Sequence, residues 1–378
     1  MTSRTYPHIR VSGSPSERGR QYGEQAGDLI RRSIHAYTAV FEFYAGIGWQ
    51  EACEQADRFI EPIESYEATY LEEMRGTAAG AGVGLNDILA LNLRSEIMFA
   101  QRAESAGLDA TSRDGCSSVA VLPRASKHGH TLLGQNWDWL IHARQTTVVL
   151  EAAQDDGPNY VTVVEAGLLA KTGMNAAGLG LVTNTLVSDR DVGEIAVPYH
   201  VCLRSLLDAS SIVDALARLQ RATRSSSANY LLAHADGLAV NVEGTPGNCN
   251  SLLLDGPRDG VITHTNHFVS PSFGSLDTGL RLMPDSFFRL QRLTDTVRGA
   301  GAELTPDRLQ QAFTDHAGHP YGVCSHPDPT VPPIDQAATI ASLVMDLNER
   351  RLWLSNGNPC ETPYRELDLS GLLTDQRP

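Results

Sequence analysis

The first third of the chain carries the hydrophobic pattern of amphipathic helices. Apolar residues recur every three or four positions from Tyr22 to Tyr37, after two candidate helix N-caps, Ser14 and Ser16. Similar spacing predicts three further helices, over residues 50–59, 62–79 and 85–101. We therefore expect residues 1–115 to form a helical N-terminal segment.

From residue 117 onward the pattern changes to short runs rich in Val, Leu and Thr. Gly, Asp, Asn and Pro separate these runs, which is typical of strands joined by turns. Residues 173–178 (Gly-Met-Asn-Ala-Ala-Gly) are expected to be one of these turns. The predicted strands would form a meandering, largely antiparallel sheet and cover residues 117–122, 131–135, 146–152, 160–165 and 179–184.

The rest of the chain mixes helices with pairs of strands. We expect helices over residues 198–208, 212–221, 286–298 and 306–315, strands over 229–234, 238–242, 251–254 and 261–263, and a terminal hairpin over 340–346 and 351–355. Segregated elements of this kind favour an α+β fold with sheets covered by helices, in one or two globular units. Residues 103–113, rich in Gly, Ser and Asp, are predicted to be an exposed linker before a core of residues 116–378.

Composition narrows the classes of partner. With 378 residues and 42% hydrophobic content, the chain has enough apolar surface for a substantial core. Its 45 acidic and 30 basic residues give a formal charge of -15, which argues against nucleic acid and anionic membrane surfaces as partners. No segment approaches the roughly 20 apolar residues of a membrane span. Six cysteines without a CxxC pair favour free thiols, so we expect a cytoplasmic protein.

Cys116 is the leading candidate for a nucleophile. It follows Gly115 and precedes an alternating apolar run, so it would stand at the start of a strand. A thiol is a strong nucleophile, and glycine reaches backbone angles that would let Cys116 attack the peptide bond before it. Cleavage there would free an α-amino group with a pKa of about 8, which is suited to act as the base for the thiol.

Several motifs together resemble the acyl-coenzyme A:6-aminopenicillanic acid acyltransferase family of N-terminal-nucleophile hydrolases. They occur in the family's order: Ser14-Pro-Ser-Glu-Arg-Gly, Asp114-Gly-Cys-Ser-Ser, Gly134-Gln-Asn-Trp-Asp, Glu165-Ala-Gly, Gly173-Met-Asn-Ala-Ala-Gly and His264-Thr-Asn-His. The resemblance implies a four-layer αββα sandwich. It also implies self-cleavage between Gly115 and Cys116, with the two fragments held together as a heterodimer.

Three further positions have candidate roles in the site. A carboxylate at Asp138 would hold the new ammonium group and tune its pKa. The resemblance implies that the side-chain amide of Asn266 donates to the developing oxyanion, a contribution of about 3 kcal/mol. Asn136 either contributes to the site or stabilises its turn.

The remaining polar positions have weaker functional signals. Ser118 and Thr245 match family hydroxyl positions near the nucleophile, although such hydroxyls are usually satisfied structural groups. Trp137 and Trp139 alternate with the polar residues of their motif and are expected to pack in the core. Glu165 is a charge within an apolar run and needs a partner if buried.

These assignments favour a cysteine amidohydrolase that cleaves the amide bond of a small N-acyl substrate through a thioester. The alternative is an acyltransferase that passes the acyl group to an amine. Hydrolysis is favoured because some family members have an arginine after a late cysteine, where this chain has Ser325 after Cys324. No metal or organic cofactor is required by this chemistry.

Two other classes of function remain as alternatives. A metal hydrolase would use two HxxH pairs, His264 with His267 and His316 with His319, together with Asp315. The HExxH helix signature is missing, however, and a proline follows His319. A non-catalytic binding protein would retain only the fold, although no tract of the sequence suggests a partner-binding segment.

Overall fold

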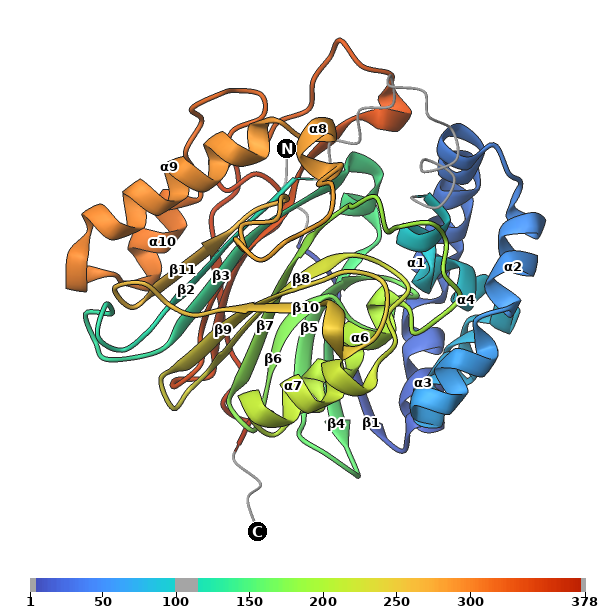
Figure 1. Ribbon diagram of the computed structural model, residues 1–378. Coiled ribbons are helices and arrows are strands. Elements are labelled where there is room, and N and C mark those ends of the chain that lie inside the picture. Colours follow the sequence, from blue (N-terminus) through green and yellow to red (C-terminus); the bar gives the residue numbers. More distant parts are fainter. Residues whose placement is uncertain (1–4, 99–114, 375–378) are drawn as a thin grey trace.

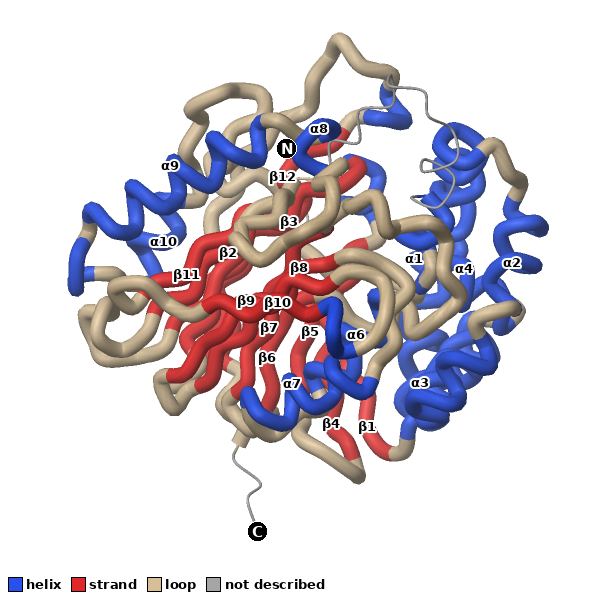
Figure 2. The backbone as a smooth tube through the Cα atoms, viewed as in Figure 1, coloured by secondary structure: helices blue, strands red, loops and turns tan. Residues whose placement is uncertain are grey.

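A computed structural model describes residues 5–98 and 115–374. The predicted linker at residues 103–113 and the last residues of the helix expected over 85–101 lie outside this range. Two β-sheets lie at the centre of the molecule, with helices around them (Figures 1 and 2). The observed layers confirm the α+β prediction and its arrangement of helices outside two sheets.

The larger sheet has eight strands. Its order is β1 (His8–Gly13), β4 (Thr147–Gln154), β5 (Tyr160–Glu165), β6 (Thr172–Asn175), β7 (Leu179–Thr185), β8 (Ala228–His234), β9 (Leu238–Gly244) and β10 (Leu252–Asp255). Neighbouring strands pair antiparallel except β1 and β4, which are parallel. The predicted antiparallel meander is thus confirmed for three of its five strands (146–152, 160–165 and 179–184), whereas those expected at 117–122 and 131–135 belong to the second sheet.

The smaller sheet has six strands, all paired antiparallel. Its order is β11 (Val261–His264), β2 (Cys116–Val121), β3 (Leu132–Leu140), β12 (Ala337–Asp346), β13 (Arg351–Ser355) and β14 (Arg365–Asp368). Cys116 is therefore the first residue of an interior strand. Both neighbours of β2 carry candidate site residues, because β3 contains Asp138 and Asn266 follows β11.

Helices cover both outer faces. α9 (Asp285–Gly299) and α10 (Pro306–Ala312) pack on the six-stranded sheet through an apolar cluster that includes Val119, Leu293 and Phe313 (Figure 1). On the other side lie α6 (Tyr199–Leu207), α7 (Ile212–Arg221) and the N-terminal helices α1 (Pro15–Ala45), α2 (Trp49–Asp57), α3 (Ile60–Ala81) and α4 (Leu85–Asn92) (Figure 1). A short α8 (Gly279–Leu282) precedes α9. None of the described helices has the length and apolar character needed to cross a membrane.

The N-terminal segment is integrated into the core. Strand β1, which the hydrophobic pattern did not reveal, extends the eight-stranded sheet. The buried Glu165 finds the partners that its position demands, Arg94 at 3.4 Å and the Tyr37 hydroxyl at 2.9 Å. Contacts of this kind tie residues 5–98 to the sheet. The boundary at residue 115/116 stays a prediction about processing.

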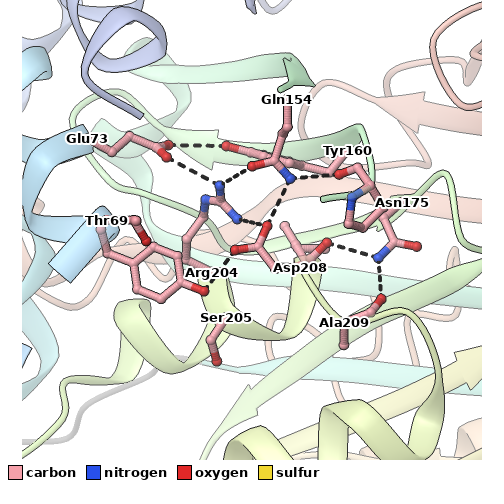
Figure 3. Close-up of polar contacts among 12 residues, drawn as sticks. Thr69, Glu73, Gln154, Tyr160, Asn175, Arg204, Ser205, Asp208 and Ala209 are labelled. Atoms are coloured by element: carbon pink, nitrogen blue, oxygen red, sulfur yellow. Dashed lines mark hydrogen bonds and ion pairs between the residues drawn. The ribbon is translucent and has the colours of Figure 1, made fainter. Parts of the chain in front are cut away.

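A second buried charge network joins the same two parts of the chain. Arg204 of α6 donates to Glu73 of α3 at 3.2 Å and to Gln154 of β4 at 2.8 Å, and it also pairs with Asp208 (Figure 3). The Tyr160 hydroxyl donates to Glu73 at 3.2 Å. Since removing one partner of such a network leaves a buried charge unpaired, the network strongly couples α3 to the larger sheet.

Most predicted elements are present, and the differences have physical reasons. Strand β3 continues through Leu140 instead of ending at Gln135, so the Asn136 and Asp138 motif lies on a strand and not in a turn. The expected turn at residues 173–178 begins as strand β6, all four residues of which pair with β5. Trp137 and Trp139 are fully buried in the core, as predicted.

Candidate active site

Cys116 lies at the point where β2 begins, between the two sheets. Side chains alternate along β2, and Cys116 shares its face with Ala120 and the paired Trp137 in the core that the two sheets enclose. Its side chain is 2% exposed. Its sulfur lies 3.9 Å from the backbone carbonyl oxygen of Asp138. The thiol is therefore enclosed, next to the peptide bond that it is expected to attack.

The peptide bond before Cys116 is held by the neighbouring strand. The backbone N–H of Asp138 donates to the Gly115 carbonyl oxygen at 2.9 Å. A Cβ atom on residue 115 would lie 2.9 Å from Asp138 Oδ2 and 3.1 Å from Arg289 Nη2. Gly115 does not have a left-handed backbone. The glycine thus leaves room for the close approach of the Asp138 carboxyl and the Arg289 guanidinium, and it is not needed for a left-handed backbone.

Asn266 contacts the backbone of Cys116 directly. Its Oδ1 accepts the Cys116 N–H at 2.6 Å, and its Nδ2 donates to the Thr185 carbonyl at 3.0 Å. The Ser286 hydroxyl accepts the backbone N–H of Asn266 at 2.8 Å, which fixes the residue after β11. In this uncut chain the amide oxygen faces the nitrogen that cleavage would release, while one amide hydrogen is donated to the sheet.

Arg289, which the sequence reasoning missed, enters the site from helix α9. Its guanidinium donates to the Cys116 carbonyl at 2.9 Å, to Asn266 Oδ1 at 3.1 Å and to the Ser117 hydroxyl at 3.3 Å. Asp285, one turn earlier, accepts from its Nε at 2.7 Å. Arg289 is only 2% exposed, so its fixed fork orders three groups around the nucleophile.

Asn184 and Lys171 complete the surroundings from the larger sheet. Asn184 of β7 donates its amide to the Cys116 carbonyl oxygen at 3.0 Å. This oxygen therefore accepts hydrogen bonds both from the larger sheet and from Arg289 of α9. The ammonium of Lys171 lies 3.2 Å from the Tyr199 hydroxyl and 5.6 Å from the centre of the Trp137 ring, which is paired with Cys116. Neither residue was predicted from the sequence.

The electrostatics of the uncut site keep the thiol protonated. Burial raises the pKa of Cys116 to about 11; the positive charges of Lys171 and Arg289 oppose this effect, and Asp138 adds to it. Burial also raises the pKa of Asp138 to about 8, against the lowering influence of Arg289 and of the Thr339 hydroxyl. Near neutral pH the carboxyl group of Asp138 is thus poised to give or take a proton.

One carboxyl oxygen of Asp138 accepts a hydrogen bond from the described residues, and the other does not. Thr339 of β12 donates its hydroxyl to Oδ1 at 2.6 Å. Oδ2 is buried and has no hydrogen-bond partner within residues 5–98 and 115–374, and it faces Gly115. A buried acceptor without a donor is costly, so its presence beside the candidate cleavage bond is consistent with a functional position.

The supporting residues predicted from the sequence direct their side chains to groups other than the nucleophile. Asn136 faces the α9 and α10 side, where its amide donates to the carbonyls of Phe313 and Val323 at 2.9 and 2.8 Å. Ser118 accepts from Gln135 at 3.3 Å, and the Thr245 hydroxyl is directed to the Pro246 carbonyl at 3.5 Å. Within the described ranges, none of these side chains hydrogen-bonds to Cys116.

The two HxxH pairs do not converge. His264 lies 2.9 Å from Glu243, and His267 lies 2.8 Å from the Ser286 hydroxyl, close to Asn266. His316 instead lies 3.1 Å from His326, in a separate cluster after α10. The arrangement of four histidines on which the metal-hydrolase alternative depended is therefore wrong.

Comparisons with known proteins agree with the motifs. A family model described as acyl-coenzyme A:6-aminopenicillanic acid acyl-transferase matches residues 125–361, more than half of the chain, beginning after Cys116. The chain is 26% identical over 319 residues to the 40 kDa form of acyl-coenzyme A:6-aminopenicillanic-acid-acyltransferase from Emericella nidulans, with 84% of each chain covered.

Solved structures with a similar arrangement include two enzymes named as hydrolase and acylase. A variant of conjugated bile acid hydrolase from Clostridium perfringens matches with a TM-score of 0.48 and 16% identity, covering 69% of this chain and 95% of that one. Penicillin V acylase from Agrobacterium tumefaciens matches with a TM-score of 0.44 and 14% identity, covering 69% and 89%. On the family match, this chain belongs to the acyl-coenzyme A:6-aminopenicillanic acid acyl-transferase family.

Proposed function

We propose that the chain is a self-processing cysteine amidohydrolase whose nucleophile, Cys116, becomes the N-terminus of a new fragment. One observation carries this proposal: three backbone polar groups at the proposed cleavage point are each held by a buried neighbour. The Gly115 carbonyl accepts from Asp138, the Cys116 nitrogen donates to Asn266, and the Cys116 carbonyl accepts from Asn184 and Arg289. Such preorganisation is what a reaction at one peptide bond requires.

In the proposed processing step, Cys116 Sγ attacks the carbonyl carbon of Gly115. The thiol proton passes to Asp138, and the Asp138 N–H stabilises the charge that develops on the Gly115 oxygen. The C–N bond then breaks, and the protonated carboxyl returns the proton to the departing nitrogen, which becomes the α-amino group of Cys116. Water hydrolyses the resulting thioester, which leaves a carboxylate on Gly115 and a free thiol on Cys116.

The mature site would use the same groups on an external substrate. The released amine stays beside Asn266 Oδ1, from where it can take the proton of its own thiol. Cys116 attacks the amide carbon of a small N-acyl substrate, the amine leaves with a proton, and a thioester remains for water to hydrolyse. The second hydrogen on Asn266 Nδ2 is the proposed oxyanion donor, since the first is donated to Thr185.

Processing would also expose the nucleophile. In the uncut chain Cys116 is 2% exposed, and the bond to Gly115 lies against Asp138 and Arg289. Cutting that bond frees the Gly115 end to move away, and the two fragments would stay associated as a heterodimer through the buried contacts of β1, α1 and α3 with the eight-stranded sheet. The proposed location is the cytoplasm, a reducing compartment that would keep the six free cysteines as thiols.

Acyl transfer is the second candidate, and the family favours it by name. The relative from Emericella nidulans is called an acyltransferase, and the same thioester would serve either reaction. The choice depends on whether water or an amine reaches the thioester first. Hydrolysis is preferred here because Val323-Cys324-Ser325 lacks an arginine that could bind an acceptor's carboxylate, and Arg289 is committed to Cys116.

A direct test measures amine release from a panel of N-acyl amino acids and of lactams that carry an acylamino group. We expect turnover with wild-type protein and none with Cys116→Ala. Cys249→Ala, which removes an exposed thiol elsewhere, is the matched control and should retain activity. Addition of a free amine acceptor separates the two reactions: a new amide product would favour transfer, and free acid alone would favour hydrolysis. Full activity in Cys116→Ala would refute both.

A further inference from the structure

Four soft-metal donors meet in a cluster that plays no part in the chemistry of Cys116. His316, Cys324 and His326 come from the loop after α10, and Cys360 comes from the loop after β13. One donor atom from each residue lies within 4.8 Å of the other three. No sequence motif predicts this group, because 34 positions separate His326 from Cys360 and neither thiol lies in a recognisable metal-binding pattern.

Four of the six distances between donor atoms are close to the edges of a tetrahedral zinc site, and the other two, from His316 to the two sulfurs, are at most 4.8 Å. With Zn–S bonds of about 2.3 Å and Zn–N bonds of about 2.0–2.1 Å, ideal edges are roughly 3.8 Å for S–S, 3.5 Å for S–N and 3.3 Å for N–N. The two sulfurs are 3.6 Å apart and the two Nε2 atoms are 3.1 Å apart. His326 Nε2 lies 3.6 Å from Cys324 Sγ and 3.4 Å from Cys360 Sγ.

The surroundings of the cluster are those of a ligand set. The other ring nitrogen of His326, Nδ1, lies 3.6 Å from a carboxylate oxygen of Glu361, the kind of outer partner that fixes a metal-bound imidazole. Asn358 directs its amide to Cys324 Sγ at 3.5 Å, a contact that favours a thiolate. Cys324 is buried, while His316 and Cys360 are exposed, so an ion has a path from solvent.

We propose that His316, Cys324, His326 and Cys360 bind one zinc ion as a structural site. Two thiolates and two neutral imidazoles leave such an ion with no net charge and no open position, so the site would be structural and not catalytic. Zinc is favoured over harder divalent cations because thiolate and imidazole are the ligands it prefers. The ion would join two loops that are also linked by the Asn358 amide, which donates to the Ser325 carbonyl at 2.6 Å.

The position of the cluster connects it to the catalytic region. Ser325, between two of the ligands, donates its N–H to the Thr339 hydroxyl at 3.0 Å and accepts the Thr339 N–H at 2.9 Å. The same Thr339 hydroxyl donates to Asp138 at 2.6 Å. Zinc would therefore hold the backbone that positions the partner of Asp138, and it would do so whether or not Cys116 acts as proposed.

The test is metal analysis of full-length protein purified without a polyhistidine tag or chelator. We expect about one zinc ion per chain by inductively coupled plasma mass spectrometry. Cys360→Ser should reduce this to nearly none. Cys360 is exposed, so this substitution leaves the core untouched, whereas Cys324→Ser would alter a buried position. The matched controls Cys249→Ser and His319→Ala, an exposed thiol and a histidine beside the cluster, should retain the ion.

Cobalt provides a second readout that is independent of how the protein was purified. Metal-depleted, reduced protein titrated with Co²⁺ should develop thiolate-to-cobalt charge-transfer absorption that saturates at about one equivalent, as one closed site requires. The Cys360→Ser variant should lose this signal. Wild-type protein that binds neither Zn²⁺ nor Co²⁺ when reduced would overturn the proposal. A Cys324–Cys360 disulfide found in freshly isolated protein by peptide mapping, with no metal bound, would do the same.

Discussion

Arg289 donates from Nη1 to the carbonyl oxygen of Cys116 at 2.9 Å, across 173 positions of sequence. The contact joins helix α9 to the first residue of β2, and the same guanidinium reaches Asn266 Oδ1 at 3.1 Å. One side chain thus orders the nucleophile and the amide that accepts its N–H. The candidate site therefore depends on the packing of α9 against the six-stranded sheet.

Arg289→Lys should lower kcat/KM by roughly 10- to 100-fold, because lysine keeps the charge but loses the fork that makes charge-assisted hydrogen bonds of about 1.5–3 kcal/mol. Steady-state kinetics on the best N-acyl substrate checks this. Arg298→Lys, on the exposed last turn of the same helix, is the matched control and should behave as wild type. Equal activity in both variants would remove Arg289 from the site.

Gly115→Ala should slow processing by at least about tenfold, equivalent to about 1.4 kcal/mol in the barrier. The added Cβ would lie 2.9 Å from Asp138 Oδ2, so the carboxylate or the scissile peptide must shift. The accumulation of uncut chain after synthesis is the measurement. Gly256→Ala is the control, since an added Cβ there would have no heavy atom within 4 Å. Processing of both variants at the wild-type rate would contradict the proposed geometry.

Asp138→Asn should stabilise the uncut chain in a pH-dependent way. Burial raises the pKa of Asp138 to about 8, above the value of about 3.9 expected when unfolded. Ionising the buried carboxyl therefore costs folding free energy, and this cost grows from about pH 4 to about pH 8 and is constant above. Asparagine avoids the cost and still accepts from Thr339.

This comparison is best made in the Cys116→Ala background, where both proteins remain uncut. The gain in melting temperature of Asp138→Asn should be near zero at about pH 4 and largest above about pH 8, corresponding to a few kcal/mol at about 1.4 kcal/mol per pKa unit. A gain that is equal at both ends of the range would show that Asp138 does not titrate as its burial implies.

Cys116 should be protected from alkylation until the chain is cut. It is 2% exposed and its pKa is raised to about 11, and both properties suppress reaction with iodoacetamide. In uncut Gly115→Ala protein, peptide mass mapping should find Cys249 alkylated and Cys116 unmodified. In processed wild-type protein Cys116 should react and activity should be lost. Rapid labelling of Cys116 in the uncut chain would contradict the burial argument.

Local pattern predicted much of the fold, since the buried strands and amphipathic helices have the expected periods. The family motifs, and not the local pattern, led us to expect Cys116, Asp138 and Asn266 in one site. Arg289 was missed because it enters from a helix whose pattern gives only an indirect signal: it occupies the face that buries Leu293 and Val297, where a charge is unusual. Asn184 is similarly a polar residue in a strand buried on both faces.

Other features had no local signal. Strand β1 is short and partly exposed, and it forms only because β4 offers a parallel edge. The cluster of His316, Cys324, His326 and Cys360 depends on two loops that meet in space, and its residues have no regular spacing in sequence. Tertiary contacts, and not propensity, decide both.

Self-processing is the central claim, and intact mass combined with amino-terminal sequencing of the purified protein tests it most directly. The account predicts two fragments, of residues 1–115 and 116–378, with Cys116 as the first residue of the second. The Cys116→Ala protein should give a single mass for the whole chain. A wild-type chain that stays unbroken between Gly115 and Cys116 and still hydrolyses N-acyl substrates would contradict the account.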